Sequence, residues 1–169
     1  MGGGVGQVCV GEQWLCALLD RLLVGASLPD SGTARLALQA LQSLATHQVR
    51  SLQGRLPQHC QPFRAAAAQL VSVTDKLVTA VFYLPWDRAD ALGNALSTYI
   101  ALDTVAFTQS AQAFIARQSV PSQQALIRAF EQLTCAREVD LHSIEKPNRV
   151  RFGQNFREFL TNVKALVLV

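Results

Sequence analysis

The chain has 169 residues, of which 50% are apolar and only 16% are charged, and its formal net charge is +3 at pH 7. A typical soluble domain carries about 25% charged residues, yet no stretch here stays apolar for the ~20 residues that a transmembrane helix needs. The weak positive charge argues against a dedicated nucleic-acid binder. The apolar residues recur at helical spacing instead, which predicts a helical domain with weakly polar surfaces that suit partners.

Six helices are expected, because proline, glycine and capping residues divide the chain into helix-length intervals rich in Ala, Leu and Gln. Strand-like alternation is nearly absent. In chain order the expected helices are Gln13–Val24, Thr33–Leu56, Phe63–Tyr83, Arg88–Arg117, Pro121–Leu141 and Val150–Leu166.

Local signals mark several of these boundaries. Ser31 or Thr33 is the expected N-cap of the second helix, and Ser119 that of the fifth. Pro147 and Asn148 are expected to separate the fifth helix from the sixth. The fourth helix is the longest, and Asp103 near its middle is expected either to pair with a basic residue across the bundle or to mark the solvent side.

Long helices joined by short loops favour antiparallel packing. The sequence therefore predicts an all-α antiparallel bundle of five or six helices with long central helices. We interpret residues 1–169 as one domain, with a flexible N-terminal tail over residues 1–8. The Ala, Gln, Leu, Ser and Thr content is similar to that of talin-rod and focal-adhesion-targeting bundles, but this similarity is one of composition only.

No catalytic or metal-binding pattern stands out. The three histidines lie outside any Glu-x-x-His pair, and His142, between Glu138 and Glu145, is expected to be solvated or to cap a helix. His59 and Cys60 are adjacent in a loop, which does not place a base against a thiol. We therefore expect no cofactor, no metal and no enzymatic activity.

The four cysteines form no Cys-x-x-Cys pair, and no secretory leader is evident. We expect buried, reduced thiols in a cytoplasmic protein. These cysteines are Cys9, Cys16, Cys60 and Cys135.

The C-terminal region is basic, since five Lys and Arg residues face one acid between residues 146 and 164. Three interpretations remain open: the solvated rim of a bundle helix, a docking face for an acidic partner, or a surface for an anionic membrane or nucleic acid. The candidate partner-binding residues are Arg149, Arg151, Phe152, Phe156 and Arg157.

Charge is also missing from two stretches, Leu36–Val49 and Thr104–Ala116. A helix without charge for three or four turns is either central in the bundle or offers a face to a partner. The sequence thus predicts a non-enzymatic protein-interaction module, an adaptor, a scaffold or a complex subunit, that binds an amphipathic helix or acidic peptide. The alternative is a peripheral bundle that binds anionic lipid through its basic C-terminal helix. Homo- or hetero-oligomers are compatible with either.

Overall fold

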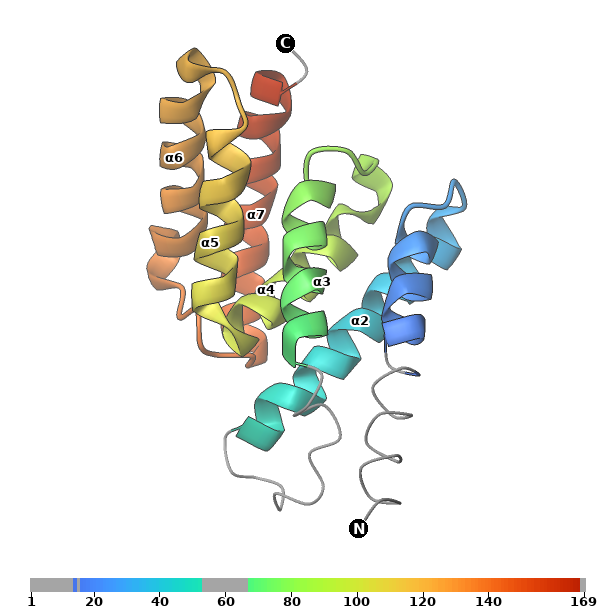
Figure 1. Cartoon of the computed structure of the whole chain (residues 1–169). Helices are drawn as coiled ribbons and strands as arrows, with labels where there is room; N and C mark the ends of the chain where they lie inside the picture. Colours follow the sequence, from blue (N-terminus) through green and yellow to red (C-terminus); the bar gives the residue numbers. More distant parts are fainter. Residues whose placement is uncertain (1–13, 15, 53–66, 168–169) are drawn as a thin grey trace.

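The computed structural model describes residues 14, 16–52 and 67–167, and within them the chain is helical with no strand (Figure 1). Seven α-helices pack together in this part, so the all-α class is confirmed and the expected number of five or six is too low. The expected tail, the His59–Cys60 loop and the start of the third helix lie outside the described residues. The helices are residues 16–26, α2 (Ser31–Leu52), α3 (Ala67–Ala80), α4 (Ala89–Leu102), α5 (Thr104–Ala116), α6 (Val120–Cys135) and α7 (Lys146–Val167).

The expected fourth helix is in fact two helices, because the chain breaks at Asp103. This residue is extended, with φ −152° and ψ 92°, and its carboxylate accepts a hydrogen bond from the Ala106 backbone N–H at 3.0 Å. Asp103 is therefore the N-cap of α5. Neither expected role for it, an ion pair across the bundle or a solvent marker, describes what the residue does.

Helix α4 is the central element. It crosses between α2 on one side of the molecule and α7 on the other, and it also contacts α3 and α5 (Figure 1). The side chains of Leu92, Leu96, Tyr99 and Ile100 are almost completely buried. The Tyr99 hydroxyl donates to the Leu41 carbonyl of α2 at 3.0 Å, and burial raises the pKa of this tyrosine.

Phenylalanines fill the space between α7 and its neighbours. Phe82 stacks on Phe114 with ring centroids 4.0 Å apart, and Phe130 meets Phe159 at 4.9 Å. Phe156 lies against Gly93 of α4, where an added Cβ would approach the phenylalanine ring to 2.9 Å. The absence of a side chain at Gly93 thus lets α4 and α7 approach closely.

Two helix starts differ from the expected ones and one agrees. Asp30, rather than Ser31 or Thr33, caps α2: its carboxylate accepts from the Thr33 backbone N–H at 2.9 Å, and the hydrogen bonds from Thr33 lower the pKa of Asp30. Helix α7 begins at Lys146, because Pro147 fits the first turn, where no backbone N–H is needed. Ser119 is the N-cap of α6, as expected.

Helix α6 ends at Cys135, and a 3₁₀ turn, η4 (Ala136–Glu138), replaces the last turns of the expected fifth helix. Arg137 and Glu138 have positive φ angles of 58° and 53°, which stops the helix. Asn155 of α7 donates from its amide nitrogen to two carbonyls at this end, those of Leu133 and Ala136.

The buried Arg88 ties the first helix to the start of α4. It ends the 3₁₀ turn η3 (Trp86–Arg88), and only 1% of its surface is exposed. Its guanidinium donates to the backbone carbonyls of Ala26, Leu28 and Pro29. A helix C-terminus leaves its last carbonyls without partners inside the helix, and Arg88 supplies donors there.

Candidate interaction surfaces

Two of the predicted partner-binding residues belong to the core. Phe152 and Phe156 are each 1% exposed and pack against neighbouring helices and each other. Both side chains serve the packing of the bundle, so their predicted role as exposed partner-binding residues is corrected. The apolar face of α7 is likewise occupied, and it does not lie open for insertion between lipids.

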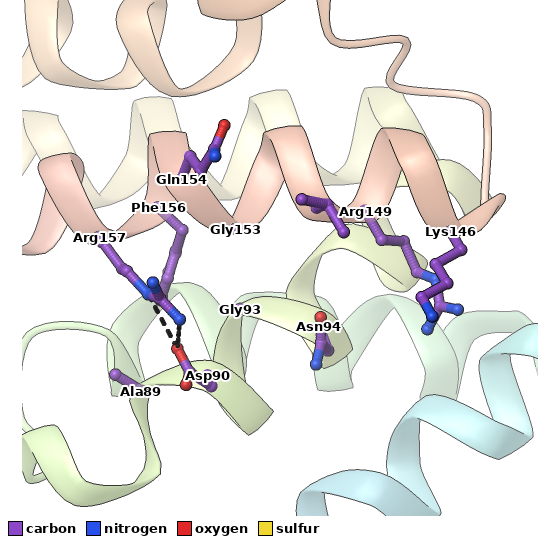
Figure 2. Close-up of a pocket in the computed structure, with 11 residues that line it drawn as sticks. Ala89, Asp90, Gly93, Asn94, Lys146, Arg149, Gly153, Gln154, Phe156 and Arg157 are labelled. Carbon is purple, nitrogen blue, oxygen red and sulfur yellow. Dashed lines mark hydrogen bonds and ion pairs between the residues drawn. The ribbon is translucent and has the colours of Figure 1, made fainter.

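The three predicted arginines are at the surface, but they do not share one site. Arg149 and Arg157 line a groove of about 390 Å³ between α4 and α7, with Phe156 in its floor (Figure 2). Arg151 is exposed and lies outside the lining of this groove. Two residues along a helix correspond to a rotation of about 200°, so Arg149 and Arg151 point to different sides of α7.

Arg157 already has a partner within the chain. Its guanidinium contacts the Asp90 carboxylate of α4 at 3.0 Å, and both side chains are largely exposed. Figure 2 shows this pair bridging the groove. Exposed ion pairs of this kind contribute less than about 1 kcal/mol, so the contact positions the side chain more than it stabilises the fold.

The first charge-free stretch, Leu36–Val49, is not a hidden helix. It lies within α2, which buries one face against α4 through residues such as Leu38, Leu41 and Ala45. The opposite face is open to solvent, and Leu36 is 67% exposed there. Gln39 and Ser43 keep that face polar without charge.

The second charge-free stretch, Thr104–Ala116, coincides with α5. This helix packs mainly on α3, whereas α6 packs mainly on α7. Between α5 and α6 lies a groove of about 480 Å³, with Phe107, Ala111 and Phe130 in its floor. Among the residues that line it, Glu131 alone is charged. The remaining lining residues are Thr108, Gln112, Ile115, Ala116, Gln123, Ile127 and Thr134.

Sequence reasoning found only one wall of this groove. The charge gap drew attention to α5, but nothing in the sequence pairs α5 with the Ile127 side of α6. Ile127 is 39% exposed although it is a large apolar residue. An apolar residue on the outer face of an otherwise polar helix is the one available signal.

The described residues offer little for catalysis or metal binding. They contain no group of three or more His, Cys, Asp or Glu side chains placed to hold a metal ion. Cys16 is half-buried and Cys135 is exposed, and both are free thiols, so the expectation of burial is wrong for Cys135. Cys9 and Cys60 lie outside the described residues. None of the described helices is long and apolar enough to cross a membrane.

Comparison of the chain with known protein families, with curated proteins and with solved structures finds no match.

Proposed function

We propose that the protein is a non-enzymatic interaction module, an adaptor, scaffold or complex subunit, that binds an amphipathic helix of a partner protein in the α5–α6 groove. The observation that supports this proposal most directly is the lining of the groove, which is apolar at its floor and uncharged along the whole of α5. Helix-in-groove recognition uses this kind of surface.

The dimensions of the groove match a short helix. Helix α5 has 13 residues, which at 1.5 Å per residue span about 20 Å. Three turns of a partner helix therefore fit along it, with apolar side chains at i, i+3, i+4 and i+7 facing Phe107, Ala111 and Phe130.

The lining also restricts the chemistry of the partner. A charged side chain facing α5 would lose its hydration without finding an opposite charge, which is costly. The contacting face of the partner is therefore apolar or small and uncharged. Glu131, at the edge of the groove, accommodates one basic residue at the rim of that face. Exposed basic residues of α7, such as Arg151, would raise the association rate of a partner with acidic flanks.

The proposal is tested with a displayed library of 18-residue amphipathic helices whose apolar faces vary. We expect the library to yield binders with an uncharged contact face. Ile127→Glu, which places a carboxylate in the groove, should raise the Kd of these binders by at least about tenfold. Calorimetry on purified protein gives the Kd values.

Leu36→Glu is the matched control, because it places the same charge on an exposed apolar residue of α2. It should leave the Kd of the selected helices unchanged. Equal effects of the two variants, or failure to select any helix, would reject the groove as the docking site. Light scattering adds a further outcome: if wild type is a dimer and Ile127→Glu is a monomer, a second copy of the chain occupies the groove and the proposed partner helix is wrong.

A further inference from the structure

A further cleft adjoins the groove between α4 and α7, with which it shares Lys146 and Arg149, and it has a different chemistry. It has a volume of about 600 Å³ and lies between α2, the segment 140–145 and the first turn of α7. Three cationic side chains line it: Arg50 from α2, and Lys146 and Arg149 from α7. Figure 2 shows the last two reaching from α7 toward the side of α4 and α2.

None of these three cations is in an ion pair in the part of the chain that the structure describes. The four ion pairs found there involve Lys76, Arg88, Arg137 and Arg157 instead. Two acids, Asp140 and Glu145, also line the cleft. The Asp140 carboxylate accepts a hydrogen bond from the His142 backbone N–H at 2.9 Å, so it serves the turn in which it lies.

The fold offsets only part of the cost of this arrangement, because Glu145 lies directly before α7 whereas Lys146 and Arg149 both lie in its first turn. The first turn of α7 contains no acid, and a cation near a helix N-terminus is disfavoured by about 0.3–1 kcal/mol because the helix dipole is positive there. The Arg149 Nε is buried and has no hydrogen-bond acceptor. An unpaired buried donor costs more still. An anion in the cleft would offset the first of these two terms, because it would lie near the cationic ends of Lys146 and Arg149.

The wall of the cleft is held in place before any ligand binds. The Asn148 amide nitrogen donates to the carbonyls of Asp140 and Ser143 at 2.7 and 2.9 Å. Its amide oxygen accepts from the Asp140 N–H at 2.8 Å. Only 3% of the Asn148 surface is exposed. The segment 140–145 is thus fixed against α7, and ordering it costs a ligand little.

We propose that this cleft binds the phosphate of a phosphate monoester. Three cations line the cleft against two acids, and the carboxylate of one of these acids, Asp140, already accepts a hydrogen bond within its own turn. A monoester carries nearly two negative charges at pH 7 and draws more from this excess of cations than a carboxylate or phosphodiester, which carries one. Arginine binds phosphate through paired N–H donors and lysine through a point charge. The phosphate belongs to a soluble phosphorylated molecule or to a lipid headgroup, since both present the same group.

The test uses three phosphate probes: soluble glycerol 3-phosphate, vesicles containing phosphatidylinositol 4-phosphate, and vesicles with the same fraction of phosphatidylserine, a phosphodiester. We expect binding of at least one monoester probe. Arg149→Gln should raise its Kd about tenfold or more, and Arg149→Lys, which keeps the charge but loses the paired donors, should have a smaller effect. Thermal unfolding of each variant verifies that it folds.

Arg128→Gln is the matched control, because it makes the same charge change on an exposed residue of α6 outside the cleft. It should leave monoester binding unchanged. Binding of glycerol 3-phosphate identifies a soluble ligand, and binding of the phosphoinositide vesicles alone identifies a headgroup. Three results would overturn the proposal: equal binding of phosphatidylserine, an equal loss in Arg128→Gln, or no binding of either monoester.

Discussion

Replacing Phe156 with alanine is expected to lower the free energy of unfolding by about 3–5 kcal/mol, the usual cost of truncating a buried phenylalanine. The side chain is 1% exposed and lies between Gly93 of α4 and the neighbouring rings of Phe152 and Phe159. Truncation leaves a cavity in the contact between α4 and α7. Chemical denaturation, followed by circular dichroism, measures the change.

Two glycine substitutions test the same contact from the other side. Gly93→Ala should destabilise the protein by about 1–3 kcal/mol, because its Cβ would lie 2.9 Å from the Phe156 ring. Gly153→Ala on α7, where nothing lies within 4 Å of the added Cβ, should instead stabilise the helix by about 0.5–1 kcal/mol. An unchanged stability in Phe156→Ala would mean that α7 does not pack as described and that Phe156 is free for a partner.

Arg88→Ala is expected to lower the free energy of unfolding by about 3 kcal/mol. The change removes the donors to the buried carbonyl of Ala26, at the end of the first helix, and to the part-buried carbonyls of Leu28 and Pro29 in the turn that follows. It also removes a positive charge from the negative end of that helix. Thermal unfolding and hydrogen exchange measure the effect, and exchange should rise most in residues 16–28.

Arg157→Ala is the control for this prediction. Arg157 is also an arginine in an ion pair, but its side chain is 67% exposed, so its loss should cost less than about 1 kcal/mol. Arg88→Lys should recover only part of the stability, because one ammonium group cannot replace the planar guanidinium at three carbonyls. If Arg88→Ala and Arg157→Ala cost the same, the buried clamp does not hold the first helix.

Helix positions were predictable because apolar spacing and turn residues are local signals. The break at Asp103 was not predicted, since the apolar pattern continues from Leu102 into Val105 and Ala106 without interruption. The break follows from tertiary packing: α4 packs against α2 and α7, whereas α5 packs against α3. A single straight helix would not make both sets of contacts. The prediction that Pro147 separates two helices was wrong, because proline also fits the first turn of a helix, and Pro147 lies in the first turn of α7.

The interaction surfaces were harder to predict from the sequence than the helix positions were. The sequence marked the α5 face by its missing charge and α7 by its surplus of cations. It did not separate Phe156, which is core, from Arg149, which faces a cleft, because the two residues lie about two turns apart and share one face of α7. The contribution of Ile127 to one groove and of Arg50 to the other depends on contacts between distant segments, and these have no local signature.

Site-specific photo-crosslinking from the α5–α6 groove shows whether a partner helix docks there. The crosslinking amino acid is placed at Gln112, which lines the groove, or at Gln132, which is exposed on α6 outside it. We expect crosslinks from position 112 alone, to a partner segment that is an amphipathic helix with an uncharged face, and their loss in Ile127→Glu. Crosslinks from position 132 alone, or crosslinks from position 112 that survive Ile127→Glu, would contradict the account.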